Sequence, residues 1–223
     1  MKENILIIAP HPDDEVLGCG GVMRLYANDN HNVYVLIVTR GTARLYSDER
    51  IKLGRSQALQ AHSILGVTET FFLDFPAPEL DTIPIASISE SIADIISKLK
   101  ISMLFIPHRG DIHIDHLIVF NAAIVSARPV GDYSIRSIFA YETLSETEWA
   151  APYSSDIFIP NHFVNIGSSV HSKLEAMSCY SGQLRKFPNP RSLEAIESLA
   201  RFRGSTISCD FAEAFMSIRT IIK

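Results

Sequence analysis

Cysteine is scarce in this sequence: only three of the 223 residues are cysteines, and they are widely separated. Cys19, Cys179 and Cys209 form no C-x-x-C pair, so neither a disulfide framework nor a thiolate zinc site is expected. Basic residues are also outnumbered, with 20 lysines and arginines against 25 aspartates and glutamates. The dense basic cluster that neutralises a phosphate backbone is missing. The composition therefore argues against nucleic-acid binding and fits a reducing compartment best.

Long apolar runs are absent too. The first apolar segment, residues 5–9, ends at Pro10 and is far shorter than the roughly 20 residues of a membrane span. It is also shorter than the core of a signal peptide. No later segment is long and charge-free enough to cross a bilayer, so we expect a cytoplasmic protein without a membrane span.

Apolar residues are nevertheless plentiful, at 47% of the chain. A chain of this length can bury a substantial core and fits one domain, residues 1–223, better than two. Apolar runs interpreted as strands lie at residues 5–9, 33–38, 70–73, 103–106 and 135–141. Segments with helical spacing of apolar residues lie between or beside them, at about 18–29, 50–65, 84–99 and 114–127. The alternation predicts an α/β, Rossmann-like fold with a mostly parallel sheet and helices on both faces.

The last third of the chain is less regular, because several prolines interrupt it. We divide the domain into an α/β core, residues 1–141, and a C-terminal flank of the same domain, residues 142–223. Elements expected in the flank are one strand, at either 157–159 or 163–166, and helices at about 169–179 and 191–202.

Two polar motifs follow expected strands. The first, Ala-Pro-His-Pro-Asp-Asp-Glu at residues 9–15, comes after the first strand, and the second, residues 107–116, comes after the fourth. The carboxyl ends of parallel strands lie along one edge of a sheet, where such folds bind ligands. The two motifs are therefore expected to meet there. In the second motif, His113 and His116 are three residues apart and lie on one face of a helix start.

The residue types in these motifs favour a metal site. Carboxylates and histidines crowded after a buried strand repel one another and lose hydration unless a cation or strong donors hold them. Histidine with carboxylate suits a catalytic zinc that keeps one position open for water. Taken alone, Asp111 is an ordinary candidate for a helix N-cap. Two such clusters at strand ends favour the metal.

The paired motifs resemble those of the PIG-L/LmbE-type zinc deacetylases, which include the N-acetylglucosaminyl-phosphatidylinositol de-N-acetylase and deacetylases of the mycothiol and bacillithiol pathways. Shorter likenesses occur at Thr39-x-Gly41, Ile64–Val67, Tyr141-Glu142, Arg203-Gly204 and Ala212–Phe215. The resemblance implies a hydrolase that uses Zn²⁺, or another divalent metal, to remove an N-acetyl group from an N-acetylglucosamine-type sugar or glycoconjugate. It also allows a homo-oligomer.

By this resemblance His11, Asp14 and His116 bind the zinc, while Asp13 stays off the metal as the general base. The assignment agrees with the chemistry. Zinc lowers the pKa of a bound water to about 7, so a neighbouring carboxylate can take its proton. Asp13 is adjacent to a ligand and suits that task.

The resemblance likewise makes His113 the group that stabilises or protonates the tetrahedral intermediate, with Asp115 orienting it. A protonated imidazole offsets the charge of a developing oxyanion, and Asp115 is expected to raise the pKa of His113 for that purpose. Glu15, Asp111 and His108 are interpreted as groups that fix the orientation of the ligands.

Substrate recognition is where this chain is expected to differ from the family. Family members carry R-x-x-E upstream of the L-G-V segment, whereas here that register reads Gly54-x-x-Gln57 and the arginine stands one place later, at Arg55. A shift of one residue turns a helical side chain by about 100°, and Arg55 is the candidate substrate-binding residue. Histidines interpreted as lying outside the site are His31, His62, His162 and His171.

Two other functions stay open on the sequence. One is an amidase that acts on another N-acyl group or on a thiol-sugar conjugate, and the other is a non-catalytic metal- or sugar-binding module. A pure binder has no use for a free base, so the intact Asp13 and His113 favour an enzyme. The expected partner is a small amino-sugar or glycoconjugate substrate.

Overall fold

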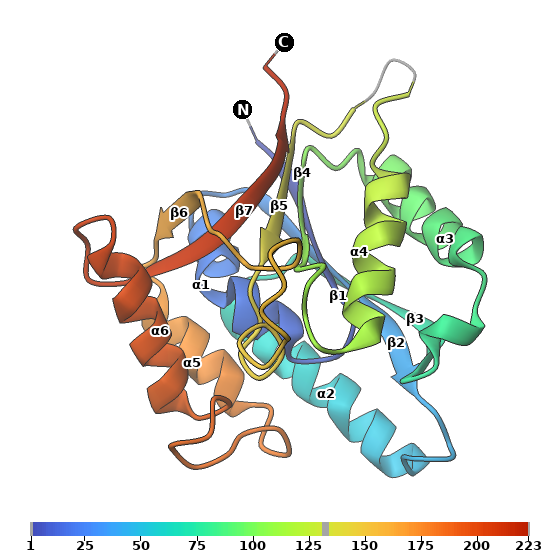
Figure 1. Cartoon of the computed structure of the whole chain (residues 1–223), viewed down its shortest axis with the longest axis horizontal. Coiled ribbons are helices and arrows are strands. Elements are labelled where there is room, and N and C mark those ends of the chain that lie inside the picture. Colours follow the sequence, from blue (N-terminus) through green and yellow to red (C-terminus); the bar gives the residue numbers. More distant parts are fainter. Residues whose placement is uncertain (1, 131–133, 223) are drawn as a thin grey trace.

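One sheet of seven strands organises the part of the chain that the computed structural model describes, residues 2–130 and 134–222 (Figure 1). The strands are β1 (Asn4–Ala9), β2 (Asn32–Gly41), β3 (Glu69–Ala77), β4 (Met103–Pro107), β5 (Ser137–Tyr141), β6 (His162–Asn165) and β7 (Ala212–Thr220). Their order across the sheet is β3-β2-β1-β4-β5-β7-β6. Strands β1 to β5 pair in parallel, whereas β7 runs antiparallel to both β5 and β6. The predicted α/β fold with a mostly parallel sheet is confirmed.

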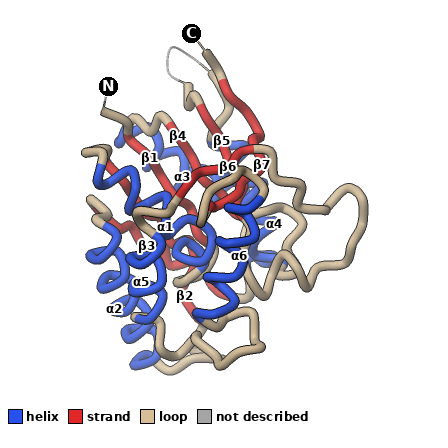
Figure 2. The backbone as a smooth tube through the Cα atoms, turned by 90° about the vertical axis from the view of Figure 1, so that its left-hand side faces the viewer, coloured by secondary structure: helices blue, strands red, loops and turns tan. Residues whose placement is uncertain are grey.

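Helices cover both faces of this sheet. They are α1 (Asp14–Asn28), α2 (Asp48–Leu65), α3 (Ile85–Leu99), α4 (Ile114–Ser126), α5 (Val170–Ser178) and α6 (Leu193–Ser205), with a short 3₁₀ helix, η1 (Leu80–Thr82), before α3. In β1, Ile5 and Ile7 pack into a core shared with α1, α2, α5 and α6, while Leu6 and Ile8 pack into a second core shared with α3 and α4. Figure 2 shows the helices of the first core, α1, α2, α5 and α6, in front of the sheet. Because every residue of such a strand is buried on one face or the other, its sequence is continuously apolar.

The chain departs from the expected elements in three places. Helix α1 begins at Asp14 rather than near residue 18, so the acidic motif is the start of the helix. Of the two alternatives for the strand in the flank, 163–166 is close to β6 and 157–159 forms no strand. Strand β7 was not expected, yet it joins the C-terminal flank to the sheet between β5 and β6.

The sheet brings the two polar motifs together. Strands β1 and β4 are neighbours, with Ile5 beside Met103 and Ile7 beside Phe105. The loops that follow these strands therefore leave the same edge side by side, as expected from the sequence. Among the described helices, none is both long and apolar enough to cross a membrane.

A buried ion pair ties the C-terminal flank to α1. Lys173 of α5 donates from Nζ to a carboxylate oxygen of Glu213 at 2.5 Å and to the backbone oxygen of Leu17 at 2.7 Å. The Glu213 carboxylate also accepts the backbone N–H groups of Gly21 and Val22, at 2.8 and 2.7 Å. Both charged side chains are almost fully buried. The pair thus bonds directly to the backbone of the helix that begins at the polar motif.

Candidate metal and catalytic site

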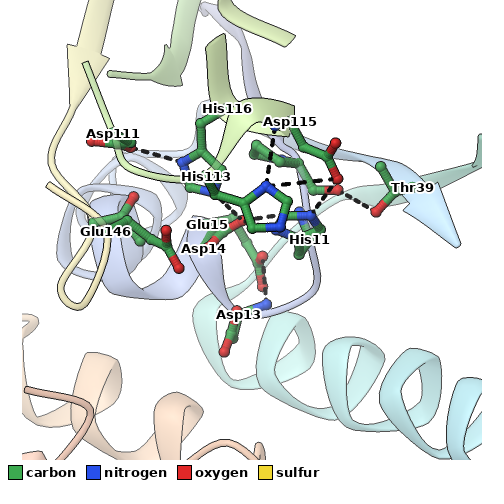
Figure 3. Close-up of polar contacts among 12 residues, drawn as sticks. His11, Asp13, Asp14, Glu15, Thr39, Asp111, His113, Asp115, His116 and Glu146 are labelled. Carbon is green, nitrogen blue, oxygen red and sulfur yellow. Dashed lines mark hydrogen bonds and ion pairs between the residues drawn. The ribbon is translucent and has the colours of Figure 1, made fainter. Parts of the chain in front are cut away.

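Three side chains from the two motifs converge at the sheet edge (Figure 3). His11 lies in the loop after β1, Asp14 begins α1, and His116 lies in the first turn of α4. Each offers one donor atom, and these atoms all lie within 4.8 Å of one another. One oxygen of Asp14, Oδ2, lies 3.3 Å from both His11 Nδ1 and His116 Nε2. The residues predicted to bind zinc are thus brought together.

Each of the two histidines is held by a carboxylate on its other ring nitrogen. Asp115 Oδ2 lies 2.9 Å from His11 Nε2, and Asp111 Oδ2 lies 2.7 Å from His116 Nδ1. Thr147 donates from its hydroxyl to the second Asp111 oxygen at 2.6 Å. A carboxylate behind a histidine is the usual arrangement around protein metal ligands, because it fixes the ring and raises its basicity.

The arrangement fits a divalent metal. Among the described residues, Asp14 Oδ1, Asp115 Oδ1 and His116 Nε2 are buried polar atoms without a hydrogen-bond partner. Such atoms are costly to leave unsatisfied, and a cation beside them removes that cost. Two imidazole nitrogens and one carboxylate are also a donor set suited to zinc with an open position.

A second group of donors, His11, His113 and Asp115, is also close enough for a metal. It is a poorer candidate because most of its donor atoms, other than Asp115 Oδ1, are already engaged. His113 Nδ1 accepts the backbone N–H of Asp115 at 3.1 Å, and Asp115 Oδ2 contacts His11. The set of His11, Asp14 and His116 leaves donor atoms unused and is therefore preferred.

The electrostatics of the donor set favour protonated imidazoles when no metal is bound. Burial lowers the pKa of His11, but hydrogen bonds to Asp115 and Asp14 outweigh it and raise the pKa to about 9. Burial also lowers the pKa of His116. The charge of Asp14 and the hydrogen bond to Asp111 outweigh this effect and raise the pKa to about 10. Burial opposes ionisation of Asp14, yet the two histidines hold its pKa well below the ordinary value.

Metal binding is therefore expected to release protons. Both raised pKa values lie above neutrality, so at pH 7 each imidazole must lose a proton to become a ligand, and about two protons should leave per metal. Apparent affinity should rise with pH up to the folded-state pKa values. Calorimetric titration with zinc in buffers of different ionisation enthalpy measures the count, and His116→Ala should reduce it. A binding heat independent of the buffer would contradict the expectation.

Asp13 occupies a strained position beside the donor set. Its φ of 109° lies in the left-handed region, which is costly for a residue other than glycine and is found mainly where function requires it. The backbone N–H donates to Glu15 Oε2 at 3.1 Å. The carboxylate is nearly fully buried; this burial raises the pKa of Asp13 to about 8, against the opposing charge of Arg191.

Arg191 is the main site residue that the sequence did not reveal. It lies between α5 and α6 and donates from Nη1 to Asp13 Oδ2 at 2.5 Å. Its Nε donates to the Ser145 hydroxyl at 2.6 Å, and its Nη2 lies 3.5 Å from Glu146. The contact with Asp13 spans 178 residues. The only indication of Arg191 in the sequence was a general one, namely that the crowded carboxylates of the first motif need a cation.

Glu15 anchors a second buried network beneath Asp13. Its Oε1 lies 3.1 Å from His62 Nε2 and accepts the hydroxyl hydrogen of Tyr180. The other ring nitrogen of His62 contacts the Thr70 hydroxyl at 2.8 Å. His62, interpreted from the sequence as lying outside the site, therefore belongs to its supporting layer, and Tyr180 was missed.

His108 differs from its sequence interpretation. Its Nε2 contacts the backbone oxygen of Asp156 at 2.8 Å, and no contact with the donor set is seen among the described residues. Glu15 and Asp111 do lie directly behind the site, as expected. His108 instead anchors the loop that follows β5.

His113 and Asp115 are related differently from the sequence expectation. The nearest Asp115 carboxylate oxygen is 3.9 Å from His113 Nδ1, against 2.9 Å from His11 Nε2, so Asp115 orients His11 instead. His113 is the N-cap of α4 and accepts the Asp115 backbone N–H. Burial and the nearby His11 lower the pKa of His113, opposite to the expected direction.

An open cavity of about 270 Å³ adjoins the donor set. His11, Asp13 and His113 line it, and so does Arg55, which lies on α2. Arg55 donates to Asp74 Oδ1 at 2.6 Å, and its guanidinium lies 4.8 Å from the centre of the Phe72 ring. The candidate substrate residue therefore reaches the cavity despite the one-residue shift. A larger cavity, of about 350 Å³ beside α6, contains none of the donor residues.

A family model connects this site to known proteins. The model of the PIG-L family, described as GlcNAc-PI de-N-acetylase, matches residues 6–127, which is more than half of the chain and includes both polar motifs. This chain belongs to the PIG-L family. It is an N-deacetylase by that membership, a hydrolase of amide bonds.

Relatives of this PIG-L chain share its sequence or its fold. YaiS, an uncharacterised deacetylase of Escherichia coli strain K12, is 30% identical over 149 residues, which cover 65% of this chain and 76% of YaiS. The structure of an N,N'-diacetylchitobiose deacetylase from Pyrococcus horikoshii is 21% identical, with a TM-score of 0.77 over 97% of this chain and 84% of that one. GalB, a 4-carboxy-2-hydroxymuconate hydratase from Pseudomonas putida KT2440, is 19% identical. Its structure gives a TM-score of 0.81 over 99% of this chain and 98% of GalB.

These structural likenesses establish the fold and no more. The same fold carries a deacetylase in one relative and a hydratase in another. Function within a fold is decided by the residues of the site. In this PIG-L chain those residues are Asp13, the donor set and the lining of the cavity.

Proposed function

We propose that this PIG-L protein is a metal-dependent N-deacetylase that removes the acetyl group from an N-acetylglucosamine-type sugar. His11, Asp14 and His116 hold the metal, and zinc is the ion best suited to their donor atoms. The observation that carries the proposal is Asp13. It is buried and strained next to the donor set, yet it is not one of the clustered metal donors.

In this proposal the metal, when bound, supplies a Lewis acid that activates water and polarises the acyl carbonyl. Asp13 takes the proton from the attacking water through Oδ1, since Arg191 engages Oδ2. Burial raises the pKa of Asp13, and an ionised carboxylate with a raised pKa is a stronger base than an ordinary one. The water oxygen bonds to the carbonyl carbon, the C–N bond breaks, and Asp13 returns the proton to the leaving nitrogen. Acetate and a free amine result.

His113 supplies the hydrogen bond to the developing oxyanion in this scheme. Because Nδ1 accepts the backbone N–H of Asp115, the proton of a neutral imidazole stands on Nε2. A neutral ring can therefore donate from Nε2, which agrees with the lowered pKa of His113. This differs from the protonated imidazole expected from the sequence, but it serves the same oxyanion.

The sugar substrate is supported by the comparisons and by the cavity. The family model is described as a GlcNAc-PI de-N-acetylase, and the Pyrococcus relative is named for an N-acetylated disaccharide. The cavity is of small-molecule size, and polar and apolar groups share its lining, with Tyr46 and Ala77 among the apolar ones. Polar groups that converge on a small cavity are what orient a polar ligand.

The proposal predicts metal-dependent release of amine from N-acetylated sugars. A panel of N-acetylglucosamine, N,N'-diacetylchitobiose, a longer N-acyl glucosamine and a thiol-sugar conjugate separates the alternatives, with amine and acetate both measured. Equal amounts of amine and acetate from the acetylated sugars, lost after chelation, support the proposal. Cleavage of only the longer acyl group or the conjugate would favour another amidase. Metal binding without cleavage of any amide would favour a binding module.

A further inference from the structure

Arginines gather on the wall of the cavity that adjoins the donor set. Arg40, Arg50, Arg55 and Arg191 all line it, in a chain whose formal net charge is −5. The carboxylates of the lining belong to Asp13 and Glu146, and Arg191 contacts both. The positive charge of the other three arginines therefore faces the cavity without a lining carboxylate to offset it.

Arg50 is the least engaged of these arginines. It lies in the first turn of α2, and its guanidinium stacks 5.4 Å from the centre of the Tyr46 ring. Its side chain has no hydrogen-bond acceptor among the residues that the structure describes. An arginine stacked on an aromatic ring keeps the N–H edge of its planar group available to an anion. Arg50 is thus oriented by a contact that leaves its donors unused.

The stack has a structural basis at the end of β2. A Cβ atom added at Gly41 would lie 2.6 Å from the Tyr46 ring, so only glycine lets that ring lie against the strand end. Gly41 and Tyr46 both line the cavity. The Tyr46 ring under Arg50 is therefore part of the cavity wall, although both side chains are also exposed to solvent.

The other two arginines are engaged to different degrees. Arg55 pairs with Asp74 and also contacts the Phe72 ring. Arg40 pairs with Asp48 at 3.2 Å, but both side chains are substantially exposed, and exposed pairs of this kind contribute little. Arg55 Nη2 also donates to the backbone oxygen of Leu73 at 3.3 Å, whereas the described residues give the Arg40 side chain no partner other than Asp48. Arg40 is therefore the second available cation.

We propose that Arg50, together with Arg40, binds an anionic substituent of the sugar substrate, a phosphate or a carboxylate. Either group accepts paired hydrogen bonds from a guanidinium. The proposal rests on the proposed function, since it places the anion in the same cavity as the amide that is hydrolysed. It assigns to this protein a charged N-acetylated sugar in preference to a neutral one.

The test compares kcat/KM for N-acetylglucosamine, N-acetylglucosamine 6-phosphate and N-acetylmuramic acid, whose extra group is a carboxylate. We expect the wild type to prefer at least one of the two anionic sugars by about tenfold or more, and Arg50→Gln to lower that preference by about tenfold. Arg44→Gln is the matched control. Arg44 has the same charge, follows the same strand and pairs with Glu79 outside the cavity lining, so its variant should keep the preference.

A binding measurement separates this proposal from the proposed function. Glucosamine 6-phosphate and glucosamine are titrated into the metal-loaded protein by calorimetry, and Arg50→Gln should weaken binding of the phosphate alone. Cleavage of neutral and anionic sugars with equal kcat/KM would overturn the anion site and leave the deacetylase standing. Tight, Arg50-dependent binding of the phosphate without any cleavage would support the anion site and contradict the deacetylase function. If the phosphate adds nothing to binding or catalysis, the proposal is wrong.

Discussion

Replacing Asp13 by asparagine is expected to lower kcat by about 10²–10⁴-fold, the usual contribution of a general base. Asparagine keeps the size of the side chain and an oxygen that can accept from Arg191, but it cannot take a proton. Position 13 is also not one of the predicted metal ligands, so the substitution should leave metal binding intact. Steady-state kinetics on a cleaved N-acetylated sugar should therefore show the loss in kcat, while the metal content matches that of the wild type.

Two controls make the Asp13 result specific. The free energy of unfolding of Asp13→Asn should lie close to that of the wild type, because the contacts of the backbone N–H with Glu15 and of one oxygen with Arg191 can both persist. The KM should change much less than kcat. A variant that binds metal normally and keeps more than about a tenth of the wild-type kcat would exclude Asp13 as the general base.

The largest effect on stability is expected from Lys173→Met. Methionine fills a similar volume but removes the charge that compensates Glu213 of β7, whose carboxylate is buried against α1. It also leaves the Leu17 carbonyl without its donor. Breaking a buried pair by removing one partner costs about 3–5 kcal/mol, and urea denaturation should show a loss of that size in the free energy of unfolding.

A second variant separates the lost charge from lost packing. Combining Lys173→Met with Glu213→Gln removes the uncompensated carboxylate and should recover part of the stability, since a glutamine oxygen can still accept the N–H groups of Gly21 and Val22. Lys52→Met on the exposed face of α2 is the matched control and should change stability by less than about 0.5 kcal/mol. A Lys173→Met cost equal to that of Lys52→Met would contradict the account.

The fold could be predicted from sequence wherever one physical rule governed a segment. Strands β1, β4 and β5 are buried on both faces, which makes them continuously apolar and easy to recognise. Strand β7 obeys no such rule. It carries Glu213 at a buried position for the ion pair and becomes half-exposed towards its end, so neither continuous nor alternating apolar residues identify it.

The candidate site could be predicted in part for the same kind of reason. His11, Asp14 and His116 stand at the ends of strands that are recognisable, so their meeting followed from topology. Arg191 could not be found because its segment reaches Asp13 only through the packing of the C-terminal flank. The prediction that Asp115 orients His113 was wrong. It rested on proximity in the sequence, whereas at the start of α4 the Asp115 carboxylate faces His11 across the sheet edge.

Metal content and acetate release, measured in the same samples of wild-type protein and His116→Ala, show directly whether this chain is a metal-dependent deacetylase. The wild type should bind about one zinc per chain and release acetate and amine in equal amounts from an N-acetylated sugar, and both should disappear after chelation and return with zinc. His116→Ala should lose metal and activity together. Acetate release that persists without metal, or a His116→Ala protein that keeps both zinc and activity, would contradict the central claim.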